Sequence, residues 1–180
     1  MTTETWVEDA RAGLRAAEVD LLAHLPDSTV APLIDALEDD PVVEAVGVTR
    51  EEQAVGVLVG GWLAGARGAL VCQSSGLATT VNALGSLAVP ARTPFVGVVT
   101  RRGDLGEFND AQIPAGYGMD RLLDALGVRN TVLADRDAVA ETVRLAADTA
   151  FATRSPYVVL LDGRVTGVKD EAEAGAGVES

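Results

Sequence analysis

Short apolar runs alternate with helical patterns along most of the chain, and this alternation restricts the fold more than any other feature. The runs expected to form strands lie at residues 19–25, 42–48, 68–73, 94–100, 130–134 and 156–162. Helical spacing of apolar residues occurs at 4–17, within 25–40, and at 50–66, 76–89, 119–127 and 137–154. Runs such as PFVGVV and YVVLL are apolar on both faces, which is typical of covered parallel strands. The chain is therefore predicted to be an α/β protein of three layers, with a six-stranded, mostly parallel sheet between helices.

Length and composition indicate one domain followed by a tail. With 180 residues, 48% of them hydrophobic, the chain can bury one sizeable core. We expect the domain to span residues 1–165. Residues 166–180 are small, acidic and aperiodic, so they are predicted to form a disordered tail.

The charge of the chain argues against two classes of partner. A formal net charge of −13 at pH 7 does not suit nucleic acid or an anionic membrane, because both require clustered Lys and Arg. The first ten residues carry acids where a signal peptide has bases, and no uncharged apolar run of about 18 residues occurs. A soluble, cytoplasmic protein is expected. One cysteine, Cys72, and one histidine, His24, are too few for a zinc site, so no metal ligands are predicted.

Ligands of open parallel sheets usually bind beyond the carboxyl ends of the strands. Four turns follow expected strands at that edge: LPDS, VTREE, QSSGLATT and the loop RRGDLGEFNDAQIPAG. The last of these, about 15 residues long, exceeds most connections in compact domains, and such loops are often functional. These turns hold the candidate site residues.

Two adjacent acids, Glu51 and Glu52, open an otherwise apolar helical segment. Thr49 and Glu52 match the S/T-x-x-E capping box, which explains Glu52 structurally. Glu51 falls in line with Val55 and Leu58 at about 100° per residue. Two interpretations of Glu51 stay open at this point: a surface acid favoured by the helix dipole, or a carboxyl at a dry helix entrance that shares a proton with a ligand nitrogen.

The turn QSSGLATT offers backbone N–H groups to an anion or a planar ring, but it lacks the phosphate-loop and dinucleotide patterns. Ser74 or Ser75 is equally suited to capping the following helix. No G-x-S-x-G elbow accompanies His24, so a serine hydrolase fits poorly.

The long loop contains two further features. Arg101 and Arg102 follow an apolar strand, where they either bind an anion or form solvated ion pairs with neighbouring acids. Gly103-Asp104, with Asn130 downstream, is similar to the GDG…N signature of thiamine-diphosphate enzymes. The third glycine is absent and Asn130 opens a predicted strand, so this match is not expected to form a Mg²⁺ site.

Five segments, taken in order and spacing, resemble the α subunit of sulfopyruvate decarboxylase and the N-terminal part of phosphonopyruvate decarboxylase. They are LPDSTVAPLIDALED, TREEQAVGVLVGGWLAG, QSSGLATTVNALGSL, TRRGDLGEFNDAQIPAG and LLDALGV. Both families are thiamine-diphosphate enzymes, and the resemblance covers roughly residues 14–162, which correspond to their pyrimidine-binding domain. The implied fold agrees with the three-layer prediction.

The resemblance also implies roles for individual residues. It identifies Glu51 as the catalytic, cofactor-activating glutamate, whose carboxyl hydrogen-bonds N1′ of the cofactor pyrimidine. The residues that it implies for cofactor binding are Glu51, Gln73, Ser74, Ser75, Gly76, Leu77, Thr79 and Asn82. Those that it implies for the substrate are Asp27, Ser28, Arg102 and Gln112. Ser74, Ala78 and Thr79 depart from the family pattern QNSGLGNSVNAL.

The same resemblance implies a partner. Because the chain has no credible GDG…N segment, it is expected to form only the pyrimidine side of the site. A β-type subunit would then hold Mg²⁺ and the diphosphate in a hetero-oligomer that decarboxylates sulfopyruvate or phosphonopyruvate. Two alternatives stay open: a synthase half-subunit that passes the adduct to an aldehyde, and a non-catalytic regulatory homologue.

Overall fold

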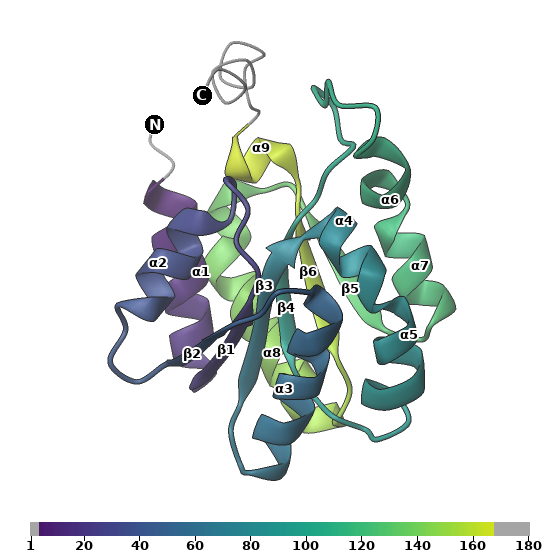
Figure 1. Ribbon diagram of the computed structural model, residues 1–180. Helices are drawn as coiled ribbons and strands as arrows, with labels where there is room; N and C mark the ends of the chain where they lie inside the picture. The colour runs from purple at the N-terminus through teal and green to yellow at the C-terminus, as the bar shows by residue number, and fades with distance from the viewer. Residues whose placement is uncertain (1–3, 168–180) are drawn as a thin grey trace.

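The computed structural model describes residues 4–167, which form one six-stranded parallel sheet between two helical layers (Figure 1). The strands are β1 (Leu21–His24), β2 (Glu44–Gly47), β3 (Gly68–Gln73), β4 (Val96–Thr100), β5 (Arg129–Leu133) and β6 (Tyr157–Leu161). Their order across the sheet is β2-β1-β3-β4-β6-β5, and every neighbouring pair is parallel. The three-layer α/β prediction is confirmed.

The central strands are buried on both faces because a helical layer covers each side. β3 and β4 consist of apolar residues and glycine except at their last positions, Gln73 and Thr100. Every residue of the two strands is buried except Gln73, which is partly exposed. In the register of the sheet, Gln73 pairs with Thr100 and Thr100 with Leu161. The carboxyl ends of three neighbouring strands therefore meet at one edge, where the chain departs into polar turns.

One helical layer consists of α1 (Glu4–Ala16), α2 (Ala31–Glu38) and α8 (Val139–Thr153). Its core contains the fully buried Trp6, Leu33 and Val143. Close packing of α1 on α8 requires Gly13, since a Cβ there would lie 2.5 Å from the carbonyl oxygen of Ala140. This layer contains no residue of the predicted catalytic or cofactor-binding set; in Figure 1 α1 and α2 lie at the left of the sheet and α8 behind it.

The other layer begins with α3 (Glu51–Leu63) and continues through a helical succession that follows β3 directly. That succession comprises α4 (Ser74–Leu77), η1 (Ala78–Thr80), α5 (Val81–Ala83) and η2 (Leu84–Ala88, a π-helical segment). The sequence predicted one helix starting at the glycine, but the helical backbone starts two residues earlier, at Ser74. Two helices after the long loop, α6 (Ile113–Tyr117) and α7 (Met119–Ala125), complete this layer.

Two short helical segments were not expected. The turn η3 (Arg136–Ala138) precedes α8, and α9 (Gly163–Thr166) follows β6. Val165 is fully buried and Thr166 is buried too, so the helical structure continues past the predicted boundary between residues 165 and 166. The remainder of the predicted tail, residues 168–180, lies outside the described residues.

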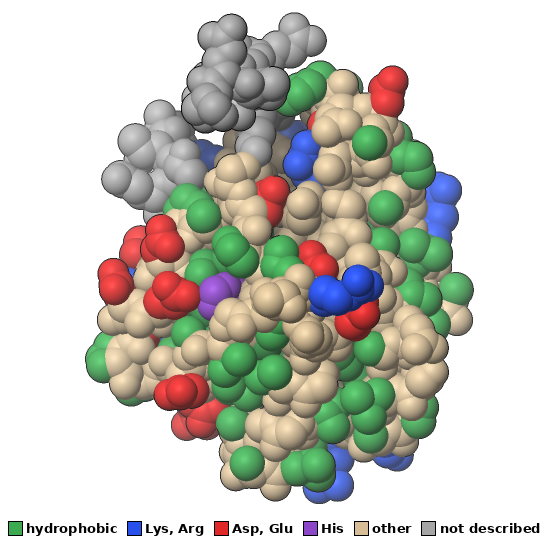
Figure 2. Space-filling model, in the orientation of Figure 1, with side chains coloured by type: hydrophobic (Ala, Val, Ile, Leu, Met, Phe, Trp, Pro, Cys, Tyr) green, Lys and Arg blue, Asp and Glu red, His purple; other side chains and the backbone are tan. Residues whose placement is uncertain are grey.

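The outward face of α3 is unusual for a surface helix. Ala54, Val55 and Leu58 pack onto the sheet, but no charged residue follows Glu52 in this helix, and a Cβ added to Gly56 or Gly60 would meet nothing within 4 Å. Leu63 at its end is 82% exposed. Figure 2 shows hydrophobic side chains gathered over the lower front of the molecule, where α3 lies. A solvent-facing helix normally carries polar residues on this side, so the face is typical of a surface that another protein covers.

Between residues 4 and 167, no helix is both long enough and apolar enough to cross a bilayer.

Candidate active site

The candidate site lies at the carboxyl ends of β1, β3 and β4, beside the first residue of α3. Glu51 is half-buried there, with Val55 and Leu58 beneath it in the core. The hydroxyl oxygen of Thr79 lies 3.5 Å from Glu51 Oε2 and 2.8 Å from the carbonyl oxygen of Gly76. The structure thus brings Glu51 together with the turn that follows β3, as the resemblance implied.

The cap of α3 differs from the expected one. Gln53, not Glu52, is the capping side chain: its Oε1 accepts hydrogen bonds from Thr49 N at 3.1 Å, Thr49 Oγ1 at 2.9 Å and Arg50 N at 3.2 Å. Glu52 instead binds the Arg50 guanidinium at 2.9 and 3.2 Å. The predicted Thr49–Glu52 capping box is therefore wrong, because the helix begins one residue later than that pattern assumes. Neither arrangement uses Glu51.

The absence of a side chain at Gly76 leaves room for the Glu51 carboxyl. A Cβ built on Gly76 would overlap the Glu51 carboxyl. Gly76 is buried, and the next residue, Leu77, is fully buried in the core, so the turn is anchored from below. Only glycine at this position leaves the carboxyl where it lies.

Two serines connect this turn to the long loop after β4. The buried hydroxyl of Ser74 accepts a hydrogen bond from the backbone N–H of Arg102 at 3.0 Å. The Ser75 hydroxyl lies 3.0 Å from Gln73 Oε1 and 2.5 Å from Gln112 Oε1. The structure therefore brings together three predicted cofactor residues and both predicted loop residues.

Asn82 does not join this cluster. It is exposed on α5, and its Oδ1 accepts a hydrogen bond from Ser86 at 3.1 Å on the same helical face. Gly76 and Thr79 lie in the first turns of the helical succession, beside the strand ends. Asn82 comes later in the same succession and lies away from them.

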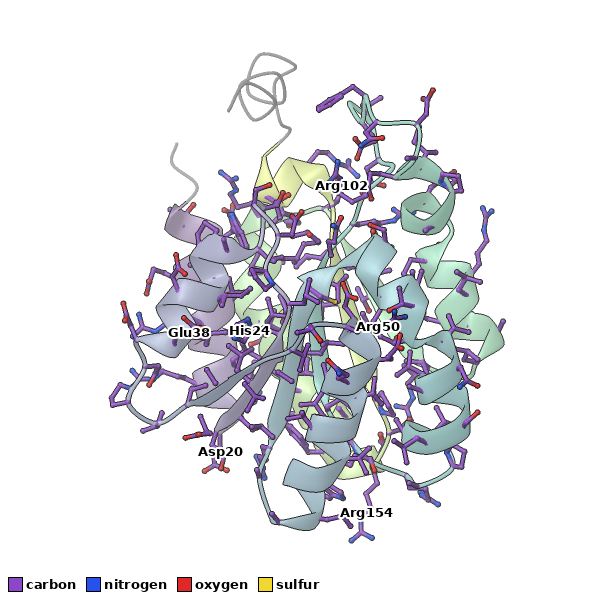
Figure 3. All side chains as sticks on the ribbon, viewed as in Figure 1. Asp20, His24, Glu38, Arg50, Arg102 and Arg154 are labelled. Atoms are coloured by element: carbon purple, nitrogen blue, oxygen red, sulfur yellow. The ribbon has the colours of Figure 1, made fainter. Side chains whose placement is uncertain are left out.

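Arg102 is held by an acid rather than left open for a ligand. Its guanidinium donates to both oxygens of Glu107, at 2.7 and 3.1 Å, and the two side chains are only 15% and 8% exposed. Arg102 lies at the upper edge of the sheet in Figure 3. The hydrogen bonds from Arg102, with help from the Asn109 and Gly103 N–H groups, lower the pKa of Glu107 to about 2 against the effect of burial. An anionic ligand of Arg102 would have to compete with this ion pair.

The pair makes a testable contribution to stability. Since the folded pKa of Glu107 lies below its unfolded value of about 4.3, the pair stabilises the fold fully above that pH and loses its effect as the pH falls toward 2. Glu107→Gln is expected to lower the free energy of unfolding by about 1–2 kcal/mol at pH 7. Urea unfolding from pH 7 to pH 2.5 should show the gap to wild type closing. Glu141→Gln, in the exposed pair with Arg144, is the control and should change little.

The turn after β1 faces the same loop. The Asp27 carboxylate accepts the backbone N–H of Thr29 at 3.0 Å, with exposed Ser28 between them. Glu107 and, more weakly, Asp27 raise the pKa of Arg102, which places Asp27 near this guanidinium. The predicted substrate residues thus lie around the loop after β4.

A pocket lies at the ends of β4 and β6; the sequence indicated Arg101 and Arg102 of its lining, but not that the turn after β6 also lines it. Its lining includes Thr29, Thr100, Arg101 and Asp104. Arg101 pairs with Asp104 at 2.9 Å, and both side chains are about nine-tenths buried, at 10% and 11% exposed. Burial raises the pKa of Asp104, and Arg101 partly offsets this. In the sequence, the position of Thr100 at the end of a strand was the signal for this pocket. The turn after β6, which also lines it, is far from Thr100 along the chain.

The remaining candidates have structural roles. His24 is buried at the end of β1, and its Nε2 lies 3.0 Å from Glu38 Oε1 of α2, the two side chains pointing toward each other in Figure 3. Cys72 is fully buried, and burial raises the pKa of its thiol. Gly103-Asp104 follows the carboxyl end of β4, whereas Asn130 lies near the amino end of β5. In a parallel sheet these are opposite edges, so they form no common site.

The comparisons with known proteins point to one family. No family model matches the chain. The sulfopyruvate decarboxylase subunit alpha of Methanococcus maripaludis is 32% identical over 80% of this chain and 86% of its own length. The corresponding protein of Methanothermobacter thermautotrophicus is 32% identical over 86% of this chain and 94% of its own. The phosphonopyruvate decarboxylase of Streptomyces viridochromogenes is 35% identical over 85% of this chain, which spans 39% of that longer protein.

A solved structure agrees on the fold. The 2-oxoglutarate:ferredoxin oxidoreductase of Magnetococcus marinus matches 94% of this chain, and 32% of its own, with a TM-score of 0.74 at 17% identity. At that identity the match shows the fold alone. Identity of about one third over most of the length of these two α subunits shows more: the chain belongs to the sulfopyruvate decarboxylase α-subunit family.

Proposed function

We propose that this chain is the α subunit of a heteromeric, thiamine-diphosphate-dependent decarboxylase of a short anionic 2-keto acid, sulfopyruvate or phosphonopyruvate. The observation that carries the proposal is the placement of Glu51 against Gly76 at the carboxyl edge of the sheet. The named activities of the relatives support the reaction type.

The residues present suit the pyrimidine half of the cofactor. Gly76 has no Cβ, which leaves space for a planar ring to meet the Glu51 carboxyl. Gln73, Ser75 and Thr79 supply polar groups around this space. Thiamine diphosphate, when bound, supplies the electron sink that lets a 2-keto acid lose CO₂. Glu51 would hold and return a proton at its carboxyl, beside the pyrimidine nitrogen.

The site keeps a polar contact at a position where the sequence departs from the family. The family asparagine is replaced by Thr79, yet the Thr79 hydroxyl lies within 3.5 Å of the Glu51 carboxyl. This contact favours a catalytic subunit over a degenerate, regulatory homologue.

The diphosphate half of the cofactor would come from a β-type partner that binds Mg²⁺. Within residues 4–167, no three His, Cys, Asp or Glu side chains form a cluster suited to a metal ion. The apolar, glycine-bearing outer face of α3 begins one turn after Glu51, so a partner that completes the site would also cover this face. The subunit names of the relatives support a heteromer.

Reconstitution tests the proposal. The chain mixed with a β-type subunit, Mg²⁺ and thiamine diphosphate is expected to release CO₂ from sulfopyruvate or phosphonopyruvate, and the chain alone should release none. Product analysis with added aldehydes separates a decarboxylase from a synthase. A complex that binds the cofactor by calorimetry but forms neither CO₂ nor a ligation product would contradict the assignment.

A further inference from the structure

Strand β5 forms one edge of the sheet, and its outer side faces no other strand in the part of the chain that the structure describes. The N–H of Asp162 donates to the carbonyl oxygen of Leu133 at 2.9 Å, so the backbone groups of Leu133 point toward β6. Because the backbone groups of successive strand residues point to alternate sides, those of Asn130, Val132 and Ala134 point outward. An edge of this kind is a template for pairing with another strand.

The devices that usually protect an edge strand are missing from β5. Its sequence, RNTVL, contains neither proline nor lysine, and its single charged residue, Arg129, stands at the first position. Asp135, just after the strand, keeps an extended backbone with φ −97° and ψ 114°, and its carboxylate accepts the N–H of Asp137 at 3.1 Å. Arg129 is exposed and forms no ion pair among the described residues. The extended edge therefore runs from an unpaired cation to a fixed anion.

The helical layer beside this edge leaves it partly uncovered. A cavity of about 210 Å³ lies between α8 and the last two strands, and its lining includes Thr131, Tyr157 and Leu145. Leu145 of α8 is 48% exposed, and Val132 of β5 is 36% exposed. The edge thus combines outward backbone groups with exposed apolar side chains, which suits a protein strand better than a small polar ligand.

The positions of the charges select a second copy of the chain as the occupant. In a twofold antiparallel pairing of β5 with β5, residues whose backbone groups point outward lie opposite each other. Two registers centred on the strand satisfy this rule, one with Val132 opposite itself and one with Thr131 opposite itself. Only the first places Arg129 of each copy opposite Asp135 of the other. Opposite charges in directly facing positions stabilise a strand pair, and like charges destabilise it.

We propose that two copies of this chain pair through β5 as an antiparallel twofold dimer centred on Val132, which joins their sheets into one. Arg129 of each copy then meets Asp135 of the other, on both sides of the axis. The order of the strands separates β5 from β1 and β3, against which α3 packs. The pairing therefore leaves the candidate site and the outer face of α3 open to a β-type subunit, and it does not depend on the proposed reaction.

Cysteine cross-linking tests the register in the full chain. In the proposed pairing the two Val132 Cα atoms lie about 5.5 Å apart, a separation that a disulfide can span. Val132→Cys is expected to form a covalent dimer under mild oxidation. Thr131→Cys, the matched control, should not, because its side chain lies opposite Leu133. Native Cys72 is fully buried, so wild type should give no cross-link.

Sedimentation velocity measures the dimer without a cross-link. Wild type is expected to be dimeric at about 100 µM, and Arg129→Asp should raise the dissociation constant at least about tenfold, because two opposite-charge contacts become like-charge contacts. Asp135→Arg should also weaken the dimer. An equimolar mixture of these two variants should restore it, which would also show that both variants fold. Arg92→Asp, the same charge change at an exposed residue before β4, should have no effect.

Three outcomes overturn the proposal: a wild-type chain that stays monomeric up to about 100 µM, a dimer that Arg129→Asp leaves unchanged, or equal cross-linking of Val132→Cys and Thr131→Cys. Hydrogen exchange identifies the other occupant. If the β5 amides are protected only after a β-type subunit is added, the edge belongs to that subunit and the proposal is wrong. None of these results bears on decarboxylation, which the reconstitution assay tests separately.

Discussion

Replacement of Glu51 by glutamine is expected to lower kcat for CO₂ release in the reconstituted complex by about 10²- to 10⁴-fold, the usual contribution of a positioned acid–base group. The glutamine amide keeps nearly the same shape and can still hydrogen-bond, but it cannot hold and return a proton. Because Glu51 supplies neither the cap of α3 nor an ion pair with Arg50, the variant should fold normally. Initial rates at saturating cofactor measure the effect.

Glu52→Gln is the matched control for this variant. Glu52 is the neighbouring acid on the same helix turn, and it binds only the exposed Arg50 guanidinium at 2.9 Å. Exposed pairs of this kind contribute about 1 kcal/mol or less, so neither stability nor kcat should change much. If the Glu51 variant retained full activity, or if the Glu52 variant lost as much, the division of roles between the two acids would be wrong.

The second large effect is expected at Gly76. In Gly76→Ala the new methyl group would occupy the position of the Glu51 carboxyl. The clash involves the end of a flexible side chain, so the fold should survive with a small change in melting temperature while the carboxyl is displaced. A displacement of about 1 Å in a catalytic group can cost about 10²-fold in rate. Calorimetric titration with thiamine diphosphate should also show weaker binding.

Gly56→Ala provides the comparison, because a Cβ there meets nothing within 4 Å and alanine favours helix. That variant should be as stable as wild type or more so. Equal cofactor affinity and kcat in Gly76→Ala and wild type would show that the Glu51–Gly76 contact has no part in the site.

The sheet was predictable from the sequence because each strand is an apolar run bounded by polar turns. Burial on both faces allows only apolar residues and glycine inside β3 and β4, so the sequence pattern predicts covered parallel strands at these positions. Because the strands are parallel, the turns that contain Glu51 and Ser75 lie at the same edge of the sheet. Their proximity follows from topology alone.

Local caps and pairings were less predictable. The S/T-x-x-E pattern fits Thr49 and Glu52, but a glutamine one position later can cap equally well, and the choice depends on where the helix backbone begins. The sequence did indicate that Arg102 follows a strand. It could not show that Glu107, five residues away, folds back onto the guanidinium.

The pocket around Thr100 and Asp104 depends on the order of the strands. β4 and β6 are neighbours although about sixty residues separate them, so the turn at Gly163 reaches a loop that sequence reasoning treats separately. Likewise no helix was predicted at Gly163–Thr166, where α9 forms and the Val165 side chain is buried in the core. Long-range packing decides both cases.

Glu51 is proposed to activate a thiamine cofactor that is shared with a partner chain. The most direct measurement is the rate at which the C2 hydrogen of bound thiamine diphosphate exchanges with deuterium in the reconstituted complex, followed by NMR after acid quenching. The account predicts exchange in wild type and in Glu52→Gln that is at least about 10²-fold faster than in Glu51→Gln. Equal exchange rates in wild type and Glu51→Gln, with the cofactor bound in both, would contradict it.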